Sequence, residues 1–301
     1  MNSVWTIASL TVREAVRRKL VAAFALISVV LVIMSGWGFY RLSHNVGFTS
    51  GETHVALPEA VILFMFMFSF VVALSASAIA SPAISSEIDS GVLQTVVARP
   101  VRRSEVLLGK WLGMAGVLAA YTAIVSGLLV AVVYWASGYV APDPEVAAAF
   151  VLAEGLVLLT VVLLLSTRLS ALAAGVLGVA LFGIAWLAGV VGTLGTTFHV
   201  QAMRTAGHIG QYLLPTDGLW HGAIYYLEPS WFISQQLAET PGAQGNPFNV
   251  PRGAVLAVPD LGGHLARDRA GARPDELRAA RAVAGPGHLR DLDAWPSRGS
   301  S

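Results

Sequence analysis

The sequence predicts an all-α integral membrane protein, and three observations lead to that fold class. Hydrophobic residues fill 55% of the 301 positions and charged residues only 12%, whereas a soluble domain carries about 25% charged residues. Five apolar runs are each long enough for a helix to cross the bilayer core, which takes about 20 residues. Basic residues gather in the connections that would share one side of the membrane.

The five expected spans lie in one membrane domain, residues 20–250. They cover residues 20–40, 59–81, 107–137, 146–166 and 171–194. The third run is longer than the bilayer core requires, so we expect this helix to tilt or to project into the cytoplasm. Polar connections at 41–58 and 138–145 and a tight turn at 167–170 separate the runs.

The charge pattern predicts a cytoplasmic N-terminus. With that orientation nine basic residues fall on the inner side, and only Arg41 and Arg204 fall on the outer side through residue 250. An excess of Lys and Arg in cytoplasmic loops sets the orientation of membrane proteins. The nine inner residues are Arg13, Arg17, Arg18, Lys19, Arg99, Arg102, Arg103, Lys110 and Arg168.

Residues 1–19 predict an amphipathic helix that lies on the inner leaflet. Its apolar positions share one helical face: Trp5, Ala8, Val12, Ala15 and Val16. Its charged positions share another: Arg13, Glu14, Arg17 and Arg18. The alternative is the start of a signal peptide. We prefer the interfacial helix, because the next apolar run is too long for a signal peptide and lacks a small-x-small cleavage site.

The polar stretch between the second and third spans, residues 82–106, predicts more structure than a simple connector needs. Ser86 can cap a helix, and Glu87 and Asp89 lie in its first turn, where the helix dipole favours acids. Four apolar residues then recur at helical spacing: Val92, Leu93, Val96 and Val97. We therefore expect a short amphipathic helix that starts at Ser86.

A proline ends this predicted helix. Arg99 precedes Pro100, and a residue before proline is disfavoured in helical backbone. Arg102 and Arg103 follow as a basic cluster, and Ser104 can cap the next helix.

This stretch resembles the cytoplasmic loop of the ABC-2 family of transporter permeases. The family pattern E-x-x-S-G-x-L-Q-x-x-x-x-R-P-x-x-R-x-E-x-x-x-G-K is matched in order over one short segment. The matching residues are Glu87, Ser90, Gly91, Leu93, Gln94, Arg99, Pro100, Arg103, Glu105, Gly109 and Lys110. Residues 165–171 resemble a second family feature, the turn between spans four and five. The overall pattern is most similar to the branch linked to multi-copper enzyme maturation.

The resemblance implies a permease subunit whose cytoplasmic loop docks on a separate ATPase subunit. It implies a multi-pass protein of the inner (plasma) membrane, working as a homodimer or heterodimer of permease chains, with export as the expected direction. ATP and Mg²⁺ would bind the partner. We expect no cofactor, metal or nucleic acid on this chain. The coupling residues implied are Ser86, Glu87, Asp89, Gly91, Gln94, Arg99, Pro100, Arg102 and Arg103. An ordinary basic cytoplasmic loop is the alternative.

Glu154 is the acid that lies well inside a predicted span, and a charge near the bilayer centre costs about 2.5–3.5 kcal/mol. Two interpretations stay open. The carboxyl faces a translocation path or a partner, or it is a protonated or Thr-bonded group nearer the outer interface. Acid–base or nucleophilic residue sets for catalysis are absent from the sequence, so a membrane-embedded enzyme, like a non-transporting scaffold, remains only an alternative function.

The outer segment, residues 195–250, combines interfacial aromatics with three histidines. The family resemblance implies short helices here that dip into the outer leaflet. His199, His208 and His221 raise the question of a metal site, but their spacing is loose and the chain has no cysteine. We therefore predict no metal site.

Residues 251–301 depart from the family pattern, which places a sixth span here. Residues 252–301 hold eight Arg, ten Ala, seven Gly and four Pro, with no apolar run of span length. One interpretation is a genuine basic tail, disordered or weakly helical. The other, which we favour, is a reading-frame shift near residue 250, because the composition changes abruptly where a span is expected. Translation of the source DNA in its other two frames tests this.

Overall fold

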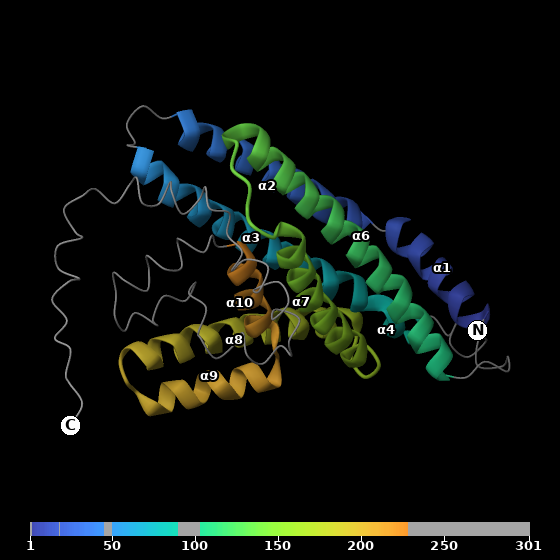
Figure 1. The fold of residues 1–301 in the computed structure, drawn as a ribbon. Helices are drawn as coiled ribbons and strands as arrows, with labels where there is room; N and C mark the ends of the chain where they lie inside the picture. Colours follow the sequence, from blue (N-terminus) through green and yellow to red (C-terminus); the bar gives the residue numbers. More distant parts are fainter. Residues whose placement is uncertain (1, 18, 45–49, 90–102, 228–301) are drawn as a thin grey trace, which may run out of the picture. The chain divides into compact units, whose positions relative to one another are not determined.

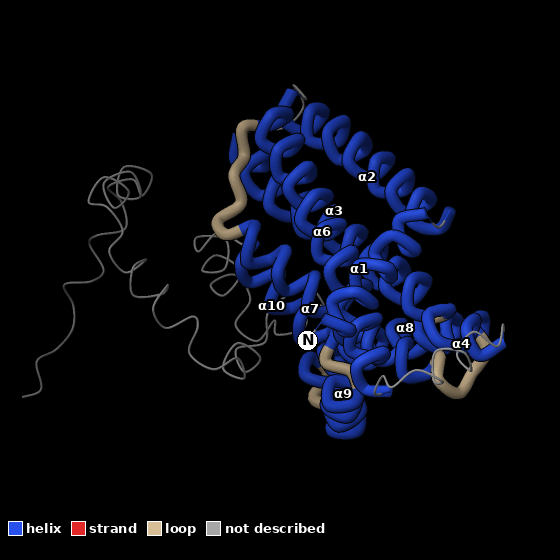
Figure 2. Tube along the Cα trace, turned by 90° about the vertical axis from the view of Figure 1, so that its right-hand side faces the viewer, coloured by secondary structure: helices blue, strands red, loops and turns tan. Residues whose placement is uncertain are grey.

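The structure is a computed structural model that describes residues 2–17, 19–44, 50–89 and 103–227. Within these ranges every regular element is an α-helix (Figure 2). The helices are α1 (Asn2–Arg17), α2 (Lys19–His44), α3 (Ser50–Ala80), α4 (Pro82–Asp89), α6 (Arg103–Ser137), α7 (Pro144–Leu165), α8 (Ala171–Thr197), α9 (Gln201–Leu213) and α10 (Thr216–Leu227). Five of them are long and apolar enough to cross a membrane, which confirms the predicted all-α membrane fold. The tail, and with it the question of a sixth span, lies outside the described residues.

The predicted connection between the first two spans is wrong at both ends. α2 continues past Tyr40 to His44, and α3 begins at Ser50 with Pro58 inside the helix. Pro58 was expected to be the last residue of the polar connection, not a residue inside a helix. Membrane helices tolerate an interior proline because neighbouring groups can satisfy the backbone that it frees.

α3 forms the centre of the bundle, in contact with α2, α6, α7 and α8. Its side chains Phe68, Val72 and Ala76 are fully buried. By contrast, α2 exposes a continuous set of large apolar residues: Leu26, Ile27, Val29, Val30, Ile33, Met34 and Trp37. A water-soluble protein rarely exposes so large an apolar patch, whereas this surface suits contact with lipid or with a second membrane chain.

Hydrogen bonds made by side chains join the apolar helices to one another. The Ser77 hydroxyl of α3 donates to the Gly175 carbonyl of α8 at 2.9 Å. The Trp111 indole of α6 donates to the Thr160 hydroxyl of α7, also at 2.9 Å. In a bilayer such bonds fix the relative register of helices whose apolar surfaces alone would be interchangeable with lipid.

α1 packs along the first part of α6 through two glycines (Figure 1). A Cβ atom on Gly109 would come 2.8 Å from Ile7 Cβ, and one on Gly113 would come 2.6 Å from the Ala8 carbonyl oxygen. This is a small-xxx-small contact. Ala8 and Ala15 are buried, whereas Trp5 is exposed. The predicted place of this helix on the inner leaflet stays a prediction.

Gly113→Ala should lower stability by about 1–3 kcal/mol, because the new methyl group meets backbone that cannot rotate away. Gly116→Ala is the matched control. It lies one turn further along α6, with no atom within 4 Å of its added Cβ, and alanine favours helix there. Thermal unfolding in a mild detergent measures both. Equal midpoints for the two variants would contradict the close α1–α6 contact.

α9 and α10 form an open hairpin that returns into the bundle from the far end of α8: its two helices have little mutual contact, and α9 packs on α8 whereas α10 packs on α7. Figure 1 shows α8 and α9 side by side and antiparallel. Gly207 of α9 meets Gly192 of α8 so closely that a Cβ on Gly207 would come 2.4 Å from the Gly192 Cα atom. α10 then runs back along α7. The predicted short helices of the outer segment are therefore present.

The tip of this hairpin reaches the middle of the bundle. Asp217, at the start of α10, lies against Gly189 of α8. Gly189 is eight residues from the end of its helix at Thr197, a depth of about 12 Å at 1.5 Å per residue. α10 then leads away from the middle of the bundle to Tyr226. The Tyr226 carbonyl oxygen accepts a hydrogen bond from the Asp143 amide.

Candidate functional site

The predicted coupling stretch starts with helix α4, and the structure corrects the role of Ser86 there. α4 begins at Pro82, so Ser86 lies inside the helix and donates its hydroxyl to the Pro82 carbonyl instead of capping a later helix. Ser104 likewise lies in the first turn of α6, which begins at Arg103. Prolines favour the first turn of a helix, because that turn has amide groups without helical partners anyway.

Lys110 fastens α4 to α6. Its ammonium group is buried and donates to the carbonyl of Ala83 in the first turn of α4. α4 also contacts α3 and α8. Gly109 and Lys110 end the family motif in the sequence, and each has a structural role here. Gly109 leaves space for α1 to pack closely on α6, and Lys110 forms a hydrogen bond to α4.

The remaining coupling residues lie mostly beyond what the structure describes. Glu87 and Asp89 belong to α4, and Arg103 opens α6. The other predicted coupling residues fall outside the described residues: Gly91, Gln94, Arg99, Pro100 and Arg102. The four apolar residues at helical spacing, Val92, Leu93, Val96 and Val97, fall outside them too. Their predicted roles stay predictions.

Glu154 lies at the centre of α7 and is buried. It is the eleventh of the helix's 22 residues, counted from Pro144. The Ser69 hydroxyl of α3 donates to Glu154 Oε2 at 2.8 Å. The partner is therefore a serine rather than the threonine considered from the sequence, and the carboxyl lies at the middle of the helix.

The hairpin tip brings a second carboxyl to the same level. Asp217 is buried, and Gln211 of α9 donates to its Oδ2 atom at 3.2 Å. His221, one turn along α10, has its Nδ1 atom 2.8 Å from the Asp217 carbonyl oxygen and 3.5 Å from Oδ2. Burial raises the pKa of the Asp217 carboxyl above its usual value, an effect that His221 and then Gln211 oppose.

A small cavity separates the two carboxyls. It has a volume of about 10 Å³ and is lined by four polar and five aromatic residues, called here its polar wall and its aromatic wall. The polar wall is made by Ser69, Glu154, Thr216 and Asp217. The aromatic wall is made by Phe66, Phe70, Phe182, Trp186 and Trp220. Four helices, α3, α7, α8 and α10, supply these residues.

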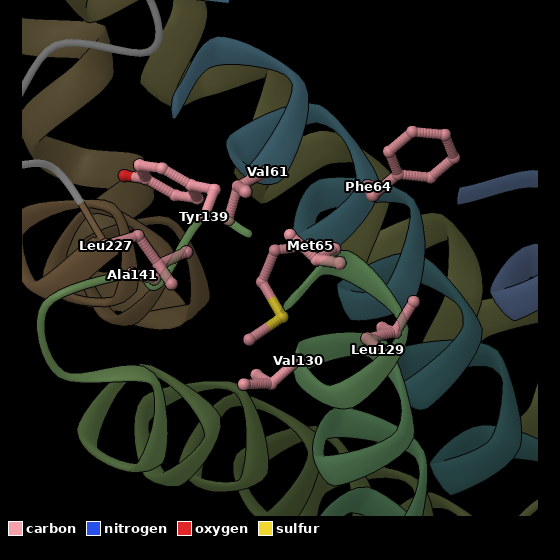
Figure 3. Close-up of a pocket in the computed structure, with 9 residues that line it drawn as sticks. Val61, Phe64, Met65, Leu129, Val130, Tyr139, Ala141 and Leu227 are labelled. Carbon is pink, nitrogen blue, oxygen red and sulfur yellow. The ribbon is translucent and has the colours of Figure 1, made fainter. Parts of the chain in front are cut away.

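A second cavity, of about 30 Å³, lies between α3, α6 and the turn after α6. Its lining is almost wholly apolar, and Figure 3 shows the Met65 side chain extending through it toward Val130. Tyr139 and Leu227 close its other side. The lining of this cavity holds no carboxyl, imidazole or basic group, so the polar centre around Glu154 is the stronger candidate site.

Glu154 was predicted from the sequence as a candidate residue, but Asp217 was not predicted as its neighbour. Asp217 stands in a polar segment, where an acid is unremarkable, and only the fold of the hairpin carries it inward. Repeated glycines on both sides of the α8–α9 turn, at 189, 192, 195, 207 and 210, were the available signal of close packing. The three histidines do not converge, and no group of three metal-binding side chains occurs in the described part of the chain.

The bundle of apolar helices around a buried polar centre defines a multi-pass membrane protein, and sequence comparison gives its class. A family model described as ABC-2 family transporter protein matches residues 5–235. The chain therefore belongs to the ABC-2 transporter family.

Two curated relatives carry the same description, probable ABC transporter permease protein NosY. The chain is 28% identical over 150 residues to the protein of Stutzerimonas stutzeri, a match to 46% of this chain and 52% of the relative. It is 32% identical over 152 residues to that of Pseudomonas aeruginosa, with 50% and 51% covered. The chain thus spans about half the length of the curated relatives it matches.

Proposed function

We propose that this permease subunit couples ATP hydrolysis on a separate ABC-type ATPase to export of a substrate across the inner (plasma) membrane. The observation that carries the proposal is the family match across residues 5–235, joined to the family motif that starts in α4. ATP and Mg²⁺ would be held by the ATPase. The chain would act as a dimer with itself or with a similar permease, its N-terminus in the cytoplasm.

The proposed mechanism begins at α4 and the stretch that follows it. Closure of the ATPase pair pushes on this stretch, where Glu87 and Asp89 supply docking charges. The bond from Lys110 to Ala83 joins α4 to α6, which supports transmission of the push into a membrane helix. The packed helices then move as rigid bodies between inward-open and outward-open states, as in hinge and shear transitions.

A pull-down of the tagged chain in mild detergent tests the proposal. We expect an ATPase with a nucleotide-binding P-loop to co-purify in near-equal amount. If no ATPase is recovered with this chain, the transporter proposal is rejected and a membrane scaffold or a membrane-embedded enzyme takes its place.

Glu87→Lys should lower ATPase recovery about tenfold and uncouple hydrolysis from transport. An exposed ion pair is worth about 0.2–1 kcal/mol, and reversal replaces that attraction with repulsion, which approaches the 1.4 kcal/mol of a tenfold change. Glu145→Lys is the control, since Glu145 is exposed in the first turn of α7, at the end predicted to face outward. Unchanged recovery and coupling in Glu87→Lys would remove Glu87 from the docking face.

A further inference from the structure

We infer that the cavity between Glu154 and Asp217 binds one small monovalent cation inside the membrane domain. The inference does not depend on the ATPase partner or on the direction of transport. It starts from the charge of the cavity wall. Two carboxyls line the cavity and interact electrostatically, and none of the nine lining residues, all of them described, is basic.

One of the residues that line this cavity has a buried hydroxyl group without a hydrogen-bond partner among the described residues. Thr216 lines the cavity and is 1% exposed, and its Oγ1 atom has no hydrogen-bond partner among the described residues. Buried hydroxyls in native proteins are nearly always hydrogen-bonded, and an exception points to an unseen water or ion. The Ser69 hydroxyl, already bonded to Glu154, lies on the same wall and offers a further oxygen lone pair.

Size and ligand type restrict what can occupy the cavity. A volume of about 10 Å³ is near the minimum that holds one water-sized group. Na⁺, K⁺ and ammonium are in this size range. Mg²⁺ usually keeps several bound waters and Ca²⁺ takes six to eight oxygen ligands, whereas this cavity has room for one water-sized group and its four polar side chains offer six oxygens at most. An anion would meet two carboxyls.

The aromatic wall also favours a cation over a neutral water. Phe66, Phe70 and Trp220 belong to the five rings that complete the cavity. The face of an aromatic ring carries partial negative charge and attracts cations, most strongly when the site is dry. A water would satisfy Thr216 but would add no charge. Asp217 has His221 at 3.5 Å, whereas Glu154 is bonded to the neutral Ser69 hydroxyl, and an unpaired buried charge is costly.

Thermal unfolding of the full chain in mild detergent tests the inference. The reference buffer contains choline chloride, because the choline cation is too large for the cavity. NaCl, KCl or NH₄Cl then replaces choline chloride stepwise, at constant ionic strength and fixed pH. One of the three ions should raise the unfolding midpoint saturably. The rise should reach about 5 °C when the ion is at 100 times its Kd.

Three single-residue variants test whether the ion-dependent rise in the unfolding midpoint comes from this cavity. Glu154→Gln and Thr216→Val should reduce the ion-dependent rise at least threefold, whereas Glu145→Gln, on the same helix but exposed, should retain it. Thr216→Val is informative even if Glu154→Gln folds poorly. If the cavity were empty, removing an unpaired buried hydroxyl would leave the midpoint in choline unchanged or raise it, with no effect on an ion response.

Three results would overturn the inference. The midpoint is the same in all four salts, or the ion response survives in both Glu154→Gln and Thr216→Val. A midpoint that follows pH but not the identity of the monovalent ion would likewise overturn it, because protons alone would then neutralise the two carboxyls.

Discussion

Gly207→Ala should lower stability by about 3 kcal/mol, which corresponds to a fall of about 6–12 °C in the unfolding midpoint of a chain this size. The new Cβ atom would lie 2.4 Å from Gly192 Cα and 3.2 Å from the Ala188 carbonyl oxygen. Both are backbone atoms, so no side chain can rotate away. Relief requires α9 to separate from α8.

The consequence extends beyond α9, because the hairpin tip supplies Asp217 to the polar cavity. Gln211, four residues beyond Gly207, holds the Asp217 carboxyl at 3.2 Å. Displacement of α9 should therefore also weaken the response to monovalent cations. Thermal unfolding in choline and in the binding cation measures both effects together.

Gly183→Ala serves as the control for this change. Gly183 lies on α8, and no atom comes within 4 Å of its added Cβ, so its midpoint should stay within about 2 °C of the unchanged protein. If both alanine variants melt alike, the close approach of α8 and α9 is not a feature of the folded protein.

The sequence predicted the spans well because their signal is local. A run of apolar residues long enough for the bilayer is visible without knowing its neighbours, and the long apolar helices fall where these runs do. Helix ends were less predictable. Pro58 and Ser86 have strong local preferences as breaker and cap, yet each lies inside a helix, since the rest of the bundle outweighs those preferences.

The candidate site was predictable only in part, for a related reason. Glu154 stands out because it interrupts an apolar run. Asp217 and Thr216 belong to a polar segment and become unusual only after the α9–α10 hairpin has placed them in the bundle. The glycine that makes room for Asp217 is Gly189, one of 30 in the chain, and composition alone does not single it out.

Glu154→Gln should impair transport at least tenfold while leaving assembly within twofold of the unchanged protein. Glutamine keeps the size of the side chain and can still accept the bond from Ser69, so packing of α7 against α3 is preserved. It removes the charge that would hold a cation and respond to movement of the helices. A carboxylate near the middle of a membrane costs about 2.5–3.5 kcal/mol of insertion free energy. Such a cost is best explained by a function that a neutral glutamine cannot perform.

Two measurements on the same cells distinguish a role of Glu154 in transport from a structural role. Transport is scored as rescue of a strain that lacks this chain, and assembly is scored as ATPase recovered with the tagged chain. Glu145→Gln should behave as the unchanged protein in both, because its carboxyl is exposed at the end of α7. Equal losses of transport and assembly in Glu154→Gln would assign Glu154 a structural role, since a carboxyl that acts only during the transport cycle leaves the resting complex intact.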